Sequence, residues 1–100
     1  MDFFWSVAEP LLAVDGVEKS TMMGYPCLRT DGDFFASVHP DSGDLIVKLP
    51  ADRVNAVIEA DEGSAFAPAG RRFREWVCIA ERDRERWAEL LEEARTFVSQ

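Results

Sequence analysis

The feature that most limits the fold of this chain is a β-hairpin signal at Asp31-Gly32, which separates two stretches of strand-forming residues. A two-residue turn of type I′ needs positive φ angles at both central positions, and Asp-Gly supplies them at low cost. The stretches on either side, Met22 to Thr30 and Asp33 to His39, are therefore expected to pair as antiparallel strands. The sequence predicts an antiparallel sheet.

Two further strands extend the predicted sheet. Pro40-Asp41-Ser42-Gly43 has the composition of a turn, and Asp44 to Leu49 follows it as the next strand, with clear alternation at its end. Arg72 to Ala80 is expected to be a fourth strand. It follows a loop from Asp61 to Gly70, in which Phe66 is expected to act as an anchor.

Three helices are expected beside the sheet. Asp2 to about Val14 has apolar residues near helical spacing, and Pro10 either kinks this helix or starts a second one. Arg53 to Ala60 places its apolar residues on one stripe. The last helix has the clearest apolar stripe, formed by Trp87, Leu90, Leu91, Ala94, Phe97 and Val98. Its outer face carries charges that are expected to be solvated: Glu81, Arg82, Glu85, Arg86, Glu89, Glu92, Glu93 and Arg95.

The predicted order is helix, three-strand meander, helix, strand, helix, in a single domain over residues 1–100. This pattern is typical of an α+β fold, with an antiparallel sheet of four or more strands and helices on one face. Alternation along the strands assigns the side chains to two faces. The core face is expected to hold Leu28, Phe34, Ala36, Val38, Leu45, Val47, Leu49, Phe73, Val77 and Ile79. The other face, which is expected to be wet, would hold Tyr25, Cys27, Arg29, Phe35, Ser37, His39, Ile46, Lys48, Arg74, Trp76 and Cys78.

The charge of the chain disfavours binding to nucleic acid. It has 19 acidic and 11 basic residues and a formal net charge of −8, whereas affinity for nucleic acid depends on neutralising phosphates. No apolar run approaches the ~18 residues needed to span a bilayer, and the start of the chain lacks the basic region of a signal peptide. We therefore expect a cytoplasmic protein that does not contact membranes.

One segment, Gly70 to Val77, departs from this acidic background because it sets three arginines and a tryptophan close together. Guanidinium and indole groups both contribute strongly to binding. Together with the basic and aromatic residues of the predicted wet face, this segment suggests a recognition surface. The candidate binding residues are Tyr25, Arg29, Lys48, Arg71, Arg72, Arg74 and Trp76.

A purely structural interpretation of these residues is also open. Arg74 and Lys48 could pair with Glu75 or nearby acids while Trp76 packs under the 61–70 loop. The functional interpretation is a binding face for a protein partner or a small anionic ligand. Because an exposed aromatic patch often marks an interface, the protein could be a monomer or a homodimer.

No residue set in the sequence indicates catalysis. Cys27 and Cys78 have no second Cys or His at zinc-ligand spacing, so they are expected to be buried free thiols. His39 is the only histidine and lacks a neighbouring nucleophile motif. P-loop, dinucleotide-binding, serine-hydrolase and zinc-protease motifs do not occur. We expect neither an enzyme nor a cofactor nor a metal site. A small hydrolase or redox enzyme that acts through Cys27, Cys78 or His39 is the weakest of the alternatives.

Five pieces of the sequence, taken in order, resemble the N-terminal domain of the TfoX/Sxy family, and more loosely the MmcQ/YjbR family. They are Met22 to Tyr25, Leu28 to Ala36, Leu45 to Leu49, Phe66 to Val77 and Leu90 to Ala94. The second piece has the aspartate-glycine turn before a phenylalanine. The fourth has the pattern glycine-arginine-x-hydrophobic-arginine-x-tryptophan-valine. The first departs from the family, because Tyr25 stands where its second glycine would be.

The resemblance implies a small α+β module without a catalytic residue set. The TfoX protein for which the family is named regulates competence, and YjbR-like proteins are often labelled DNA-binding. The leading hypothesis is therefore a non-enzymatic interaction or regulatory module. The alternative is a nucleic-acid-binding domain.

Overall fold

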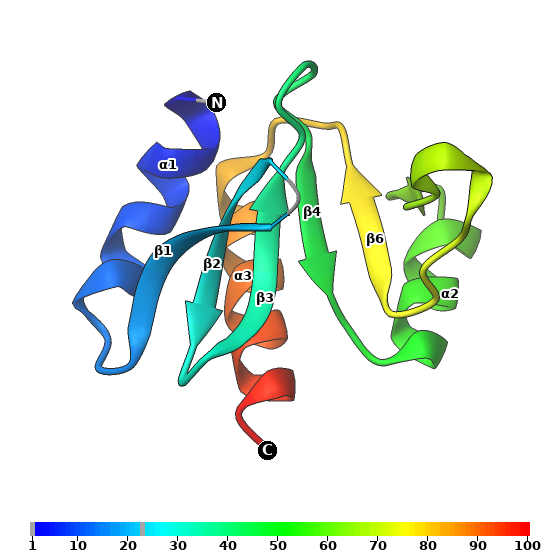
Figure 1. Cartoon of the computed structure of the whole chain (residues 1–100). Coiled ribbons are helices and arrows are strands. Elements are labelled where there is room, and N and C mark those ends of the chain that lie inside the picture. Colours follow the sequence, from blue (N-terminus) through cyan, green and yellow to red (C-terminus); the bar gives the residue numbers. More distant parts are fainter. Residues whose placement is uncertain (1, 23) are drawn as a thin grey trace.

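The computed structural model describes residues 2–22 and 24–100 and contains one antiparallel sheet of six strands with helices beside it (Figure 1). Met1 and Met23, the latter part of the first family-like piece, lie outside the described residues. The strands are β1 (Val17–Met22), β2 (Tyr25–Thr30), β3 (Asp33–Val38), β4 (Leu45–Lys48), β5 (Ser64–Ala65) and β6 (Trp76–Ile79). The helices are α1 (Asp2–Ala8), α2 (Ala51–Glu59) and α3 (Arg84–Val98), with 3-10 helices η1 (Glu9–Ala13) and η2 (Pro68–Gly70). The predicted α+β class is confirmed.

The sheet has the strand order β1-β2-β3-β4-β6-β5, and every neighbouring pair is antiparallel. The predicted turn joins β2 to β3, with φ angles of 51° at Asp31 and 89° at Gly32. The predicted first helix ends at Ala8, and the chain continues as η1 with Pro10 in its first turn. The second of the two alternatives for Pro10 is therefore the one observed.

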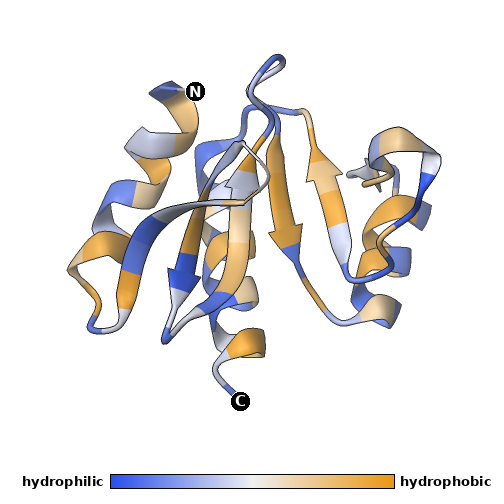
Figure 2. Cartoon of the chain, in the orientation of Figure 1, coloured by the Kyte–Doolittle hydropathy of each residue, from blue (hydrophilic) through white to orange (hydrophobic). Residues whose placement is uncertain are grey.

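Two strands of the sheet were not predicted, β1 and the two-residue β5. The first predicted strand began at Met22, whereas the chain forms a separate strand from Val17 that pairs with β2 along its whole length. Strand β1 lies at the edge of the sheet and is mostly hydrophilic, as Figure 2 shows. An edge strand without apolar alternation leaves no periodic signal in the sequence.

A β-bulge in β3 reverses the predicted faces of Phe34 and Phe35. The register runs from Leu28↔Ala36 to Arg29↔Phe34, so Phe35 has no partner in β2. An extra residue in one strand shifts the alternation of the residues that follow it. Phe35 is therefore fully buried in the core, and Phe34 is only half-buried.

The predicted strand from Arg72 is shorter than expected, which corrects the placement of Phe73. Strand β6 begins at Trp76, and the Trp76 backbone N–H donates to the Phe73 carbonyl at 3.2 Å in a turn. Alternation does not extend through this turn. Phe73 lies outside the core cluster and packs against Phe66, with ring centroids 5.8 Å apart.

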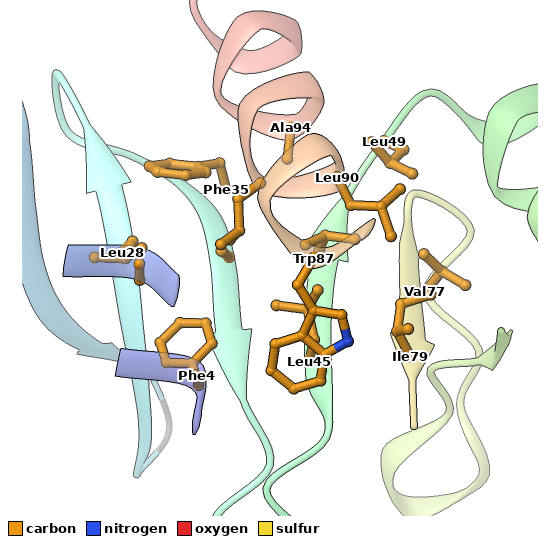
Figure 3. Packing of buried hydrophobic residues seen from close by; sticks show 14 of the residues in the cluster. Phe4, Leu28, Phe35, Leu45, Leu49, Val77, Ile79, Trp87, Leu90 and Ala94 are labelled. Carbon is orange, nitrogen blue, oxygen red and sulfur yellow. The ribbon is translucent and has the colours of Figure 1, made fainter. Parts of the chain in front are cut away.

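The core lies between the sheet and the helices. Figure 3 shows Trp87, Leu90 and Ala94 of α3 among the buried side chains of the strands, with Phe4 of α1 on the same side. The fully buried Trp87 ties the elements together, because its indole N–H donates to the Glu81 carbonyl at 2.7 Å and its ring meets Phe3 edge-on at 4.8 Å. Helix α3 starts at a side-chain cap, where Asp83 accepts from the Arg86 N–H at 3.1 Å.

Packing of α3 on the sheet predicts a large cost for truncating its buried stripe. Leu91 is fully buried, so Leu91→Ala is expected to lower the free energy of unfolding by roughly 2–5 kcal/mol. Urea denaturation measures this change, and Thr96→Ala on the exposed side of the same helix serves as a near-neutral control. If both variants unfold at the wild-type urea concentration, α3 does not pack on the sheet as described.

Candidate functional site

The sheet face opposite the helices is partly covered, which corrects the expectation of a wet face. Cys27, Ser37 and Ile46 form one row across β2, β3 and β4. The core cluster lies on the helix side of the sheet and does not include these three residues. Their exposed fractions are nevertheless 0%, 1% and 1%. Side chains of this second face must therefore cover them, since the helices lie on the other side of the sheet.

Aromatic side chains from two distant strands meet over this face. Tyr25 begins β2 and Phe66 follows β5. Their ring centroids are 6.2 Å apart with the planes at 75°, although β3, β4 and β6 lie between the two strands. The two rings must therefore reach toward each other across the sheet. Tyr25 also meets His39 edge-on at 5.5 Å.

The segment between α2 and β6 folds back on the sheet for reasons visible in its sequence. A Cβ at Gly63 would lie 2.8 Å from the Cys78 carbonyl oxygen, so only glycine allows the segment to approach β6 this closely. Farther along, Gly70 has a φ of 81°, which L side chains rarely adopt, and the chain turns back there. The Phe73 N–H then donates to the Phe66 carbonyl at 3.0 Å, which holds these two phenylalanines side by side.

The result is a small apolar cavity of about 170 Å³, which we call the aromatic pocket. It is lined by Met22, Tyr25, Phe66, Pro68, Phe73 and Trp76. Met22, Tyr25 and Trp76 come from the ends of β1, β2 and β6, and the other three lining residues come from the segment between α2 and β6. Apart from the Tyr25 hydroxyl, the Trp76 indole N–H and the weakly accepting sulfur of Met22, its lining side chains have no group that could act as a donor or acceptor.

A second hollow of about 410 Å³ adjoins the aromatic pocket, and we call it the basic groove. It is lined by Lys48, Ala51, Phe73, Arg74, Glu75 and Trp76. Phe73 and Trp76 line both hollows, so they form the wall between them. Lys48 is the direct partner of Trp76 in the β4–β6 ladder, so the two side chains leave the sheet side by side on the same face.

The basic residues around these hollows differ from most others in the chain, because within residues 2–22 and 24–100 none of them has a carboxylate at ion-pair distance. Elsewhere the ion pairs are Arg29–Glu18, Arg53–Glu93, Arg82–Asp44, Arg86–Glu62, Arg86–Glu89 and Arg95–Glu92. Arg71 instead lies over the Phe73 ring at 5.4 Å, and Arg72 donates to the Asn55 side-chain oxygen at 3.1 Å. Lys48 and Arg74 line the basic groove without such a partner among the described residues.

The structure thus brings together some of the predicted site residues and not others. Tyr25, Lys48, Arg74 and Trp76 line the two adjoining hollows, and Arg71 lies at their edge. Arg72 points to α2, and Arg29 is held by Glu18 of β1 at 2.7 Å.

Sequence reasoning missed four residues that line the aromatic pocket, Met22, Phe66, Pro68 and Phe73, and two more in the basic groove, Ala51 and Glu75. Phe66 was expected only as a loop anchor. The one available signal was an isolated phenylalanine in an otherwise small and polar loop.

Part of the structural interpretation holds, because Trp76 lines the same pocket as Phe66 and Pro68 of the 61–70 loop. The expected pairing of Lys48 and Arg74 with acids is not observed among the described residues.

A larger hollow of about 530 Å³ lies beside α3 and α2, lined mainly by Glu89, Glu92, Glu93 and Phe97. Arg95 pairs with Glu92 from the next turn, and Arg53 pairs with Glu93 at 2.8 Å. These charges are solvated and already partnered. We therefore assign no site to this hollow.

The two thiols lie in the sheet, and the histidine lies in the turn before β4. Cys27 and Cys78 are free and lie in one row of the sheet with β3 and β4 between them. Their Cα atoms are thus about 14 Å apart at ~4.8 Å per strand, beyond disulfide reach. The His39 Nδ1 accepts from the Asp41 N–H at 3.2 Å, which holds the turn before β4. Over the described residues, no group of three or more metal-ligating side chains occurs.

No family profile, curated protein or solved structure is significantly similar to this chain. The resemblance to the TfoX/Sxy family therefore stays a prediction. Within residues 2–22 and 24–100, no helix is long and apolar enough to cross a bilayer.

Cys27 is buried and Cys78 is only half-buried, which corrects the expectation of two buried thiols, but desolvation makes both of them poor nucleophiles. Desolvation raises the pKa of Cys27, and desolvation together with the Asp44 carboxylate raises the pKa of Cys78 from 9.0 to about 11. At pH 8 we therefore expect iodoacetamide to alkylate Cys78 at least about 100-fold more slowly in the folded protein than in urea, because the reactive species is the thiolate. Peptide mass spectrometry separates the two sites.

The same pKa shift has a consequence for stability. The pKa of Cys78 is higher in the folded than in the unfolded protein. Its contribution to the free energy of unfolding is therefore complete below pH 9.0 and is lost as the pH rises toward 11. The thermal midpoint should fall over this range, and less so in Cys78→Ala. Rapid alkylation of Cys78 at pH 8 in the folded protein would contradict the burial described here.

Proposed function

We propose that this domain is a non-catalytic interaction or regulatory module, which binds a protein partner or a small anionic ligand on the sheet face opposite the helices. One observation carries the proposal: an aromatic pocket shares a wall with a groove whose cations have no ion-pair partner among the described residues. Aromatic rings beside cations are typical of the parts of interfaces that contribute most to affinity.

The charge balance supports an anionic ligand. Acids outnumber bases by 19 to 11 in this chain, so a carboxylate would be easy to place beside any cation. Lys48, Arg71, Arg72 and Arg74 nevertheless lack one in the described part of the chain. A ligand carboxylate or phosphate in the basic groove would supply the missing counter-charge, and the half-buried indole of Trp76 beside it would strengthen the attraction by excluding water.

A nucleic-acid-binding domain is the second candidate. Its support is the cluster of aromatic rings with cations nearby, a combination that is also found on surfaces that bind single strands. The net charge of −8 argues against it, because phosphates would be repelled by most of the surface.

Membership of the TfoX/Sxy N-terminal family, or of the YjbR-like family, is part of the same proposal. It is supported by the order of the five sequence pieces and by the Asp31-Gly32 hairpin, which lies where that family places one.

We also propose a cytoplasmic location. Its support is that the two thiols are free and too far apart to bridge, as suits a reducing compartment.

Titration with two small apolar carboxylates, one aromatic and one aliphatic, tests the ligand site. Indole-3-acetate and hexanoate at millimolar concentration should shift the indole N–H cross-peak of Trp76 in 1H–15N spectra, because the ring lines both hollows. The peaks of Trp5 and Trp87 should not move. Trp76→Ala should weaken binding about tenfold or more, as expected for a central aromatic contact, whereas Trp5→Ala on the helix side should not.

The opposite results would be equally clear. Equal shifts of all three indole peaks, or no shift at saturating probe, would contradict a site on this face. If dodecathymidylate bound with micromolar affinity at 150 mM salt and Arg71→Ala with Arg74→Ala removed that binding, the nucleic-acid alternative would replace the proposal.

A further inference from the structure

We infer that the ligand of this face is an extended acidic peptide segment of a partner protein, with one aromatic or large aliphatic side chain in the aromatic pocket and a carboxylate in the basic groove against Lys48 and Arg74. This inference rests on the proposed function and specifies its ligand. It follows from the size of the pocket, the spread of the cations and the connection between the two hollows.

The size of the aromatic pocket limits what can enter it. Its volume of about 170 Å³ is below the roughly 300–1,000 Å³ of sites that enclose a whole drug-sized molecule or cofactor. A single apolar group of a larger ligand is therefore the best match. Pockets that accept one anchor side chain are a common feature of peptide recognition.

The spread of the cations argues against a compact anion such as a free phosphate. A phosphate is bound by several donors that converge on one point. Here only Lys48 and Arg74 line the same groove, while Arg71 covers Phe73 and Arg72 is held by Asn55 beside α2. Charges distributed in this way match carboxylates distributed along a chain.

The hollows also adjoin in a way that suits an extended backbone. Phe73 and Trp76 separate the aromatic pocket from the basic groove, so a ligand can continue from one into the other. Lys48 is paired directly with Trp76, and such cross-strand neighbours have Cβ atoms about 4.5–5.5 Å apart. With ~3.3 Å per extended residue, the first carboxylate should lie about one to three residues from the anchor. Glu75 in the same groove would disfavour a second carboxylate beside it.

Selection from a random twelve-residue peptide library on the immobilised full chain tests this inference. The enriched peptides should carry Trp, Phe, Leu or Met with Asp or Glu within about three positions. Fluorescence anisotropy of one enriched peptide should show at least tenfold weaker binding to the double variant Lys48→Glu with Arg74→Glu. Binding should also weaken with rising salt, because the pairs form at the surface. Both substituted residues line the basic groove and lie outside the core. An unchanged thermal midpoint of the double variant verifies that the fold is kept.

Lys19→Glu is the matched control for charge, because Lys19 is exposed on the helix-side face near Trp5. It should leave peptide affinity nearly unchanged. Enrichment of peptides without acidic residues, no enrichment at all, or equal loss in Lys19→Glu would overturn the inference. If the small acids still shift the Trp76 indole peak while no peptide is enriched, the proposed site stands and only its peptide ligand is wrong.

Discussion

The structure depends on the fact that the sheet has two faces and that the helices cover only one of them. The buried side chains of α1 and α3 pack on a single side, as Figure 3 shows, so the row formed by Cys27, Ser37 and Ile46 would otherwise be open to water. An exposed apolar face of this kind promotes association between chains. The chain covers part of it by sending the segment between α2 and β6 back over the sheet, where Phe66 meets Tyr25.

This cover is small and incomplete, and its incompleteness creates the candidate site. One returning segment can bury a row of side chains but cannot fill the space between Tyr25 and Trp76, so the aromatic pocket remains. The same segment ends in the arginine-rich turn before β6, which brings Arg71 and Arg74 to the edge of the pocket. The same short stretch of sequence thus covers the second face of the sheet and forms part of the candidate recognition surface.

Local sequence signals predicted those parts of the fold that local chemistry determines. The Asp31-Gly32 turn and the stripe of α3 are examples, because turn geometry and helical spacing appear directly in the residue order. The faces of Phe34 and Phe35 could not be predicted, since a one-residue bulge has no clear signal in sequence. Strand β1 was missed because its stability comes from pairing with β2. Phe66 was not expected to join Tyr25 at the site, because the contact spans the sheet and depends on how the whole segment folds back.

A double-mutant cycle on Tyr25 and Phe66 tests the central claim most directly, namely that the returning segment covers the second face of the sheet. The free energies of unfolding of Tyr25→Ala, Phe66→Ala and the double variant give the coupling between the two rings. Edge-on aromatic contact predicts a coupling of about 0.5–1.5 kcal/mol. If the two single effects add to within about 0.3 kcal/mol, the rings do not touch in solution and the second face is not covered in this way.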